Sequence, residues 1–163
     1  ASWRRYGSTN ERRIFGVIQD ITAQEENKQK YLDNALLFQT IMDVLPCYFF
    51  IKDADHDFRY LQANDTFCDF VNCPKAELLG QTADELRNRD IDLGQFDSDD
   101  RAVVATGHKT ESTERVLRSD GSYRYIRIVR MRYRRYDGVQ LLIVLGFDIT
   151  ELEQAKQEIT DKI

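Results

Sequence analysis

Histidine and cysteine are scarce in this sequence, and no long apolar run is present. The 163 residues include two histidines, His56 and His108, and three cysteines. An odd number of cysteines in apolar or helical contexts does not suit a disulfide framework, so we expect a reducing, cytoplasmic compartment. No segment approaches the length of a transmembrane helix, and the first residues lack the apolar core of a signal peptide. We therefore expect no direct membrane contact here, and a membrane anchor elsewhere in the full-length protein is compatible with this expectation.

The residue patterns of catalytic and metal sites are also missing. No nucleophile, base and orienting group assemble into a triad, and no glycine-rich phosphate loop follows a strand. Cys68 and Cys73 lie five residues apart without a nearby histidine, so we expect buried or surface thiols and no metal site. One acidic set does not follow the spacing of a calcium-binding EF-hand loop: Asp90, Asp92, Asp97, Asp99 and Asp100. The net charge of -5 gives no reason to expect a nucleic-acid partner.

The most informative stretch that is present runs from Leu141 to Glu153. Five apolar residues, 141–145, predict a buried strand, which passes through Gly146 and Phe147 directly into Asp148-Ile149-Thr150. Thr150 and Glu153 have the spacing of a capping box, so a helix should begin here. Because strand and helix are joined without a linker, we expect Asp148, Thr150 and Glu153 to form a joint that transmits movement of the sheet to the helix.

A second copy of this joint lies near the beginning of the sequence. Asp20-Ile21-Thr22 repeats the tripeptide at 148–150, and it also follows an apolar segment and precedes a charged, helical one. Trp3 to Ile21 has the pattern of a hairpin with a turn at 7–10. We therefore interpret residues 1–22 as the last hairpin of a preceding module of the same kind.

Residues 23–45 predict a helix that ends before Pro46. Apolar residues along it follow the alternating spacing of four and three that is typical of a coiled-coil seam. The members of this seam are Tyr31, Ala35, Phe38, Met42 and Leu45. We expect the helix to pair with its copy in a homodimer, and the alternative is an amphipathic helix that lies on its own sheet.

Residues 46–150 read as one domain. Strands are predicted at 47–52 and 58–62, short helices at 65–71, 75–79 and 83–86, and a helix at 97–106 that Asp97 caps. Three further strands follow at 111–118, 123–136 and 139–148, with Asp-Gly turns between them. Residues 151–163 begin an output helix.

This order of elements resembles the PAS sensory domain. The resemblance rests on Ala63-Asn64, on Glu77-Leu78-Leu79-Gly80, on Ser119-Asp120-Gly121-Ser122 and on Asp148-Ile149-Thr150. It implies an α+β fold whose five-stranded antiparallel sheet has the order 2-1-5-4-3, with short helices and a pocket on one face. It also implies tandem use ahead of output domains such as histidine kinases. We therefore expect this segment to be non-catalytic, with any kinase activity located in the output domain of the full-length protein.

The resemblance raises the question of a cofactor, and two kinds are disfavoured. The flavin photoreceptor subfamily carries a reactive cysteine where this sequence has Ala83, so we expect no photoactive flavin. Haem-binding relatives use an axial histidine, whereas His108 follows Gly107 in a predicted exposed turn. The identity of any ligand stays open.

If a pocket exists, its wall should be mostly apolar, and Arg130 is a candidate to bind a carboxylate ligand. The candidate residues are Phe49, Ile51, Phe67, Phe70, Leu79, Leu86, Val103, Val104, Ile126, Ile128, Arg130 and Leu142. Two functions remain in view. One is a sensor that relays a ligand- or partner-induced change through the joint at 148–150 to an effector in the same chain. The other is a dimerisation or spacer module whose core is filled.

Overall fold

The computed structural model describes residues 2–87 and 89–163, with side chains described from residue 12 onward. The chain divides into two compact units, Ala1–Ile41 and Met42–Ile163. Among the described residues, no helix combines the length and the apolar character needed to cross a membrane.

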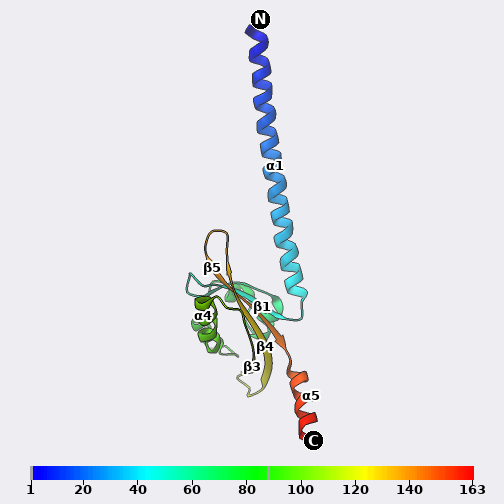
Figure 1. Ribbon diagram of the computed structural model, residues 1–163, viewed down its shortest axis with the longest axis vertical. Coiled ribbons are helices and arrows are strands. Elements are labelled where there is room, and N and C mark those ends of the chain that lie inside the picture. The colour runs from blue at the N-terminus through cyan, green and yellow to red at the C-terminus, as the bar shows by residue number, and fades with distance from the viewer. Residues whose placement is uncertain (1, 88) are drawn as a thin grey trace. The chain divides into compact units, whose positions relative to one another are not determined.

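Helix α1, Ser2–Val44, makes up the first unit and extends into the second (Figure 1). It confirms the helix expected at 23–45, which ends ahead of Pro46, but the hairpin expected at 3–21 is wrong. A helix satisfies its backbone hydrogen bonds within one segment, whereas a two-stranded hairpin needs further strands or a covering helix. Thr22 accordingly does not cap a helix, because its hydroxyl donates to the Ile18 carbonyl at 2.9 Å. The assignment of residues 1–22 to a preceding module stays a prediction.

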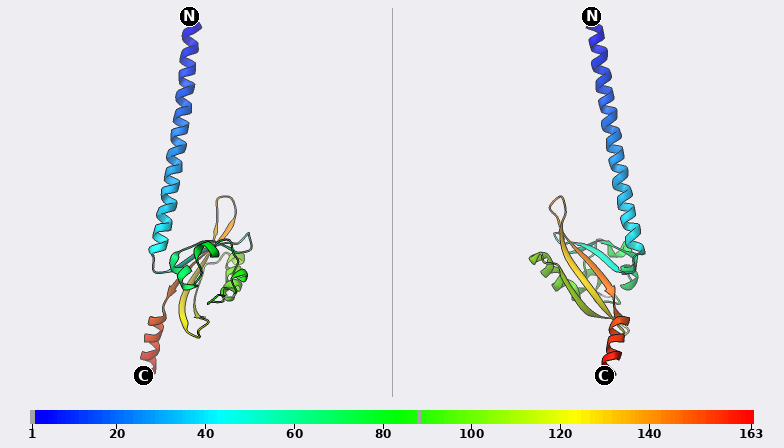
Figure 2. Two further views of the ribbon diagram at one scale, coloured as in Figure 1. Left: turned by 180° about the vertical axis from the view of Figure 1, so that it is seen from behind. Right: turned by 45° about the vertical axis from the view of Figure 1, so that its right-hand side comes forward.

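The second unit is built on a five-stranded antiparallel sheet in the order β2-β1-β5-β4-β3, which confirms the expected fold class (Figures 1 and 2). The strands are β1 (Tyr48–Asp53), β2 (Arg59–Ala63), β3 (Thr110–Leu117), β4 (Tyr123–Arg134) and β5 (Gln140–Asp148). The turns that join β3 to β4 and β4 to β5 contain Gly121 and Gly138, with φ of 86° and 89°. Glycine adopts these positive φ values without steric cost, and the Asp-Gly pairs therefore mark the turns correctly.

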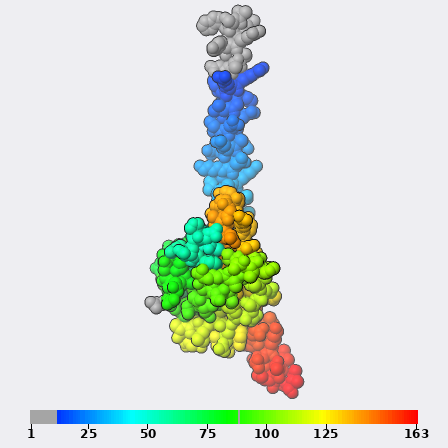
Figure 3. Space-filling view, turned by 60° about the vertical axis from the view of Figure 1, so that its left-hand side comes forward, coloured from blue at the N-terminus to red at the C-terminus, as the bar shows by residue number. Residues whose placement is uncertain are grey.

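The remaining elements are short, and all but one lie between β2 and β3 in the sequence. They are α2 (Asp65–Phe70), α3 (Lys75–Leu78), η1 (Asp84–Leu86), η2 (Leu93–Phe96), α4 (Asp97–Thr106) and, after β5, α5 (Thr150–Asp161). The expected cap of α4 is wrong, because Phe96 occupies the N-cap position without a side-chain bond. The space-filling view shows this region, in green, forming much of one face of the second unit (Figure 3).

The hydrophobic core lies between these helices and one face of the sheet. Its fully buried side chains come from both layers and include Val71, Leu78, Ile91, Val103 and Leu142. Three charged side chains, Lys52, Asp100 and Arg130, are buried with them at 2% exposure or less. Because buried charges are costly unless they are paired, these three side chains require partners within the core.

Candidate ligand cavity and helix joint

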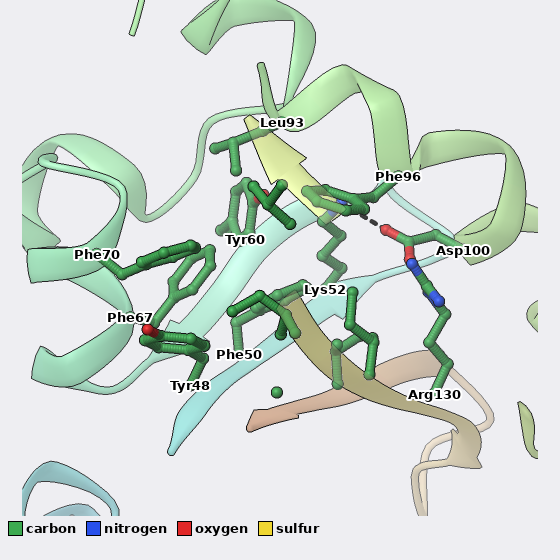
Figure 4. Close-up of a pocket in the computed structure, with 15 residues that line it drawn as sticks. Tyr48, Phe50, Lys52, Tyr60, Phe67, Phe70, Leu93, Phe96, Asp100 and Arg130 are labelled. Atoms are coloured by element: carbon green, nitrogen blue, oxygen red, sulfur yellow. Dashed lines mark hydrogen bonds and ion pairs between the residues drawn. The ribbon is translucent and has the colours of Figure 1, made fainter. Parts of the chain in front are cut away.

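A small internal cavity of about 40 Å³ lies between the sheet and the short helices (Figure 4). A cavity must have a volume of roughly 10–15 Å³ to hold one buried water, and an engineered cavity that binds benzene has a volume of about 150 Å³. The cavity therefore has room for a very small molecule, and a ring would have to move its wall. The lining residues are Tyr48, Phe50, Lys52, Tyr60, Phe67, Phe70, Leu93, Phe96, Asp100, Val116, Ile126, Ile128, Arg130, Val144 and Gly146.

Strand β1 turns Tyr48, Phe50 and Lys52 toward the cavity. Side chains alternate along a strand, so Phe49 and Ile51 lie on the other face of the sheet, and their prediction as pocket residues is wrong. The reason is the sequence 47–51, which is apolar at every position and therefore does not reveal which face is internal. Lys52 points to the wrong parity, because lysine is rarely buried and the sequence alone would therefore place residues 48, 50 and 52 on the outer face.

The other predicted pocket residues fall into three groups. Phe67, Phe70, Ile126, Ile128 and Arg130 line the cavity. Leu86, Val103 and Leu142 are buried in the surrounding core, and partly buried Val104 packs against it, but none of the four lines the cavity. Leu79 is 37% exposed and lies outside this core. The sequence analysis missed the other ten residues of the cavity wall, which are Tyr48, Phe50, Lys52, Tyr60, Leu93, Phe96, Asp100, Val116, Val144 and Gly146.

Aromatic rings fill most of the space around the cavity. The rings of Tyr48 and Phe70 stack with centroids 4.2 Å apart, and Phe50 lies 4.7 Å from Phe67 and 5.3 Å from Tyr60. Such ring pairs stabilise each other beyond the area that they bury. Burial, with the nearby Asp100 charge as a smaller cause, also raises the pKa of Tyr60, which therefore stays a neutral phenol.

Two buried cations converge on one carboxylate at one end of the cavity (Figure 4). Lys52 Nζ lies 2.8 Å from Asp100 Oδ2, and Arg130 Nε lies 2.9 Å from Asp100 Oδ1. Arg130 Nη1 also lies 3.1 Å from Glu114 Oε1, whose side chain is 24% exposed. The cluster thus connects β1, β4, β3 and α4, and removing one partner alone would leave a buried charge less well paired.

The joint between β5 and α5 is a compact hydrogen-bond cluster. Asp148 Oδ1 accepts from the Thr150 amide at 3.0 Å and from the Thr150 hydroxyl at 2.5 Å. The same hydroxyl oxygen accepts from the Tyr125 amide of β4 at 3.0 Å, and the Tyr125 carbonyl accepts from the Ile149 amide at 2.9 Å. The first turn of α5 is therefore bound to the sheet. The capping box is wrong, since Thr150 binds Tyr125 and the Glu153 side chain pairs with Lys156 at 3.4 Å.

Tyr48 connects the cavity to this joint. Its ring lines the cavity, while burial and the charge and hydrogen bond of Asp148 raise the pKa of its hydroxyl to about 12. Gly146 lies opposite Tyr48 in the paired strand, and a Cβ there would come within 3.3 Å of the Tyr48 side chain. The glycine therefore leaves room for the ring. A displacement of Tyr48 would reach the carboxylate that holds the first turn of α5.

Asn64 holds the beginning of β1, next to Tyr48, and is completely buried. Its amide nitrogen donates to the carbonyls of Met42 at 2.9 Å and Cys47 at 2.7 Å. Its oxygen accepts from the amides of Phe49 at 3.1 Å and Phe67 at 3.0 Å, the latter as the N-cap bond of α2. Asn64 therefore joins the chain that enters the domain to β1 and to the helix that carries Phe67.

Comparison with known proteins agrees with this architecture. The family model described as the PAS fold matches residues 42–154. A protein of Sinorhizobium fredii, described as the uncharacterized protein y4lL, is 26% identical in an alignment of 129 positions that covers 73% of this chain and 14% of that protein. The chain thus spans a small part of this relative's length.

Two solved structures illustrate the similarity of fold. The Vibrio cholerae VqmA–ligand–DNA complex superposes with a TM-score of 0.58 at 22% identity, covering 73% of this chain and 51% of that one. A PAS domain from a two-component sensor histidine kinase superposes with a TM-score of 0.55 at 13% identity, covering 73% and 98%. At these identities the likeness shows the fold alone.

Proposed function

Because this chain belongs to the PAS fold family over residues 42–154, we propose that its second unit relays a change in the cavity to an effector through the joint at Asp148 and Thr150. PAS domains are sensory and signalling modules and are generally not catalytic. The relay would work as a population shift between two conformations of the second unit. The conformation that binds the ligand or partner more tightly must also be the one in which α5 has the signalling orientation.

The observation that supports this relay best is that Tyr48 lies both in the cavity wall and beside Asp148 of the joint. Its ring forms part of the cavity wall, and its hydroxyl is close enough to Asp148 for that carboxylate to raise the hydroxyl's pKa. Asp148 in turn binds the Thr150 amide and hydroxyl at the start of α5. A ligand that shifts the stacked rings of Tyr48 and Phe70 would therefore change the hydrogen bonding of the joint.

The test compares signalling by Tyr48→Phe and by the double variant Asp148→Ala/Thr150→Ala in the full-length protein. Tyr48→Phe keeps the stacked ring and removes the hydroxyl that interacts with Asp148, so we expect a weakened response at a cost of about 1 kcal/mol in unfolding free energy. The double variant loses the joint bonds, and we expect output that no longer follows input while the PAS unit stays folded. Output is read as effector activity with and without stimulus.

Tyr133→Phe is the matched control, because Tyr133 is on β4 and 55% exposed. It should leave both stability and response unchanged. A normal response in the folded double variant would overturn the relay.

We further propose that the effector is a two-component histidine kinase in the same chain and that the module works as a homodimer. The kinase proposal follows the common use of PAS domains and the sensor kinase among the similar folds. VqmA is a counterexample, since its structure contains DNA. The net charge of -5 opposes direct binding of nucleic acid by this segment, so the charge favours a kinase effector over a DNA-binding role like that of VqmA. The three free, buried cysteines support a cytoplasmic location.

A second candidate function is a dimerisation or spacer module that senses nothing itself. The small size of the cavity favours this candidate, because about 40 Å³ leaves no room for a ring without rearrangement. Native mass spectrometry of the purified protein followed by a thermal-shift screen separates the two functions. A bound species or specific stabilisation supports sensing, and the absence of both supports the spacer.

A further inference from the structure

We propose that Lys52 and Arg130 form a carboxylate-binding site that Asp100 occupies in this structure, and that the ligand of the cavity is a small organic carboxylate with an apolar body. The ligand's carboxylate would take the place of the Asp100 side chain, and its body would lie among the aromatic rings. This inference rests on the proposed sensory function and names the ligand class of the same cavity.

The geometry of the two cations supports a site for an oxyanion. Lys52 is 1% and Arg130 2% exposed, and each binds a different oxygen of one carboxylate, at 2.8 and 2.9 Å. Arg130 also binds Glu114 Oε1 at 3.1 Å and Ser112 Oγ at 3.4 Å, and its Nη2 lies 4.0 Å from Asp99 Oδ2. Lys52, Asp100 and Arg130 form a fully buried group with one positive charge in excess. Glu114 and Asp99 are 24% and 63% exposed, so water screens them more.

The position of Asp100 makes exchange feasible. Lys52 and Arg130 are on strands of the sheet, whereas Asp100 is on α4, one of the elements that cover the cavity. A surface groove of about 300 Å³ lies between α4 and β3, and Arg130 lines both this groove and the cavity. An incoming carboxylate could therefore reach Arg130 from the groove. Release of Asp100 would return one carboxylate to water and loosen α4, which gives the small cavity the space that a larger ligand needs.

The apolar body follows from the rest of the wall. Phe50, Phe67, Phe96 and Val144 also line the cavity. Phe96 lies next to Asp100, and Phe67 lies on the side of Tyr48 and Phe70 (Figure 4). A charged ligand without an apolar part would make no use of these side chains. A hydrocarbon ligand would make no use of Lys52 and Arg130, which would stay paired with Asp100. Only a molecule with both parts uses the whole site.

The first experiment measures thermal shifts of the full chain with benzoate, phenylacetate and 3-phenylpropionate and with the three matching amides, at constant ionic strength. We expect at least one acid to raise the melting temperature by roughly 5 °C at ten times its Kd, and its amide not to do so. Lys52→Met and Arg130→Met each leave Asp100 paired with one cation, and each should abolish the preference for the acid. Equal shifts with acid and amide, or no shift with any of the six, would overturn the proposal.

The second experiment is chemical rescue of Asp100→Ala by acetate. The variant leaves two buried cations without their carboxylate, so we expect a lower melting temperature that acetate raises more than acetamide or chloride does. Equal effects of the three additives on the folded variant would contradict an anion site. If the variant does not fold, the acid and amide series on the unmodified chain decides.

Both readouts measure binding to the PAS unit and not signal output. The thermal shifts should therefore persist in Asp148→Ala/Thr150→Ala, in which the relay is lost. Failure of the acids would leave the relay standing, and failure of the relay would leave the carboxylate site standing.

Discussion

Asn64 shows how one side chain can organise the entry to the domain. Its side-chain amide makes four hydrogen bonds. The nitrogen donates to the carbonyls of Met42 and Cys47, and the oxygen accepts from the amides of Phe49 and Phe67. Its replacement leaves two buried carbonyls and two buried amides without their side-chain partner, and a buried group without a partner costs free energy.

We expect Asn64→Ala to lower the free energy of unfolding by about 3 kcal/mol, because it removes an N-cap and leaves several buried polar groups unpaired. Urea unfolding followed by circular dichroism measures the loss. Asn34→Ala, at an exposed position of α1, is the control and should change the value by less than about 0.5 kcal/mol. An Asn64 variant as stable as this control would contradict the structural role of Asn64.

The three thiols should be unreactive in the folded protein. Burial raises the pKa of Cys47, Cys68 and Cys73, and for Cys68 the value is about 11. At pH 8 the folded Cys68 then has on the order of 10²-fold less thiolate than an unfolded cysteine with its ordinary pKa near 8.5. We expect slow reaction with a disulfide reagent until guanidinium is added, followed spectrophotometrically.

The same shift affects stability at high pH. The unfolded Cys68 thiol loses its proton at a lower pH than the folded one. Its contribution to the free energy of unfolding is therefore fully present below about pH 8.5 and is lost as the pH rises toward 11. Rapid labelling of all three thiols in the native protein at pH 8 would show that the burial is wrong.

At the scale of elements, two glycines should respond in opposite ways to substitution by alanine, one just past the end of α4 and one inside α1. Gly107 ends α4 with φ of 73°, and an added Cβ would overlap the guanidinium of Arg132. Arg132 Nη1 donates to the Val104 carbonyl at 3.1 Å in the last turn of the same helix. Gly16 lies within α1 with open space around it.

We expect Gly107→Ala to destabilise the second unit by about 1–2 kcal/mol, because alanine is strained at positive φ and displaces Arg132. Gly16→Ala should instead increase the stability of α1 by about 1 kcal/mol, since alanine favours the helix interior. Thermal melts followed by circular dichroism at 222 nm measure both. A stabilising Gly107→Ala would mean that α4 does not end as described.

The sequence predicted the elements of the sheet better than their faces. Asp-Gly turns and alternating or apolar runs mark the strands to within two residues, because these patterns reflect local backbone preferences. Which alternate side chains of β1 face the core depends on the side of the sheet that the helices cover. The residues ahead of Lys52 are all apolar, so the sequence does not show which of them face the helices. The helix joint was recognised, but its partner Tyr125 is distant in the sequence, so the capping box appeared as the only available bond.

At the scale of the whole molecule, the proposed homodimer depends on α1. The seam residue Tyr31 is 73% exposed, and apolar neighbours such as Leu36 and Leu37 are also more than half exposed. Pairing with a second helix would bury such side chains, and an acidic residue at a seam position opposes this burial.

We expect the full chain to sediment as a dimer and the double variant Tyr31→Glu/Ala35→Glu as a monomer. Gln29→Glu, on the opposite side of the helix, adds the same kind of charge outside the seam and should leave the dimer intact. Sedimentation velocity distinguishes these states. A dimer that persists in the double variant would place the association elsewhere on the molecule.

The sheet order also determines how this domain would respond to tension. The chain enters at Tyr48 and leaves after Asp148, and β1 pairs with β5 in antiparallel register so that Tyr48 lies opposite Gly146. Force applied through the two ends would therefore open the pair from one end, breaking the hydrogen bonds in succession and not in parallel. The first bonds to open would be those beside Tyr48, so a weak pull would reach the cavity wall before it disturbed the rest of the sheet.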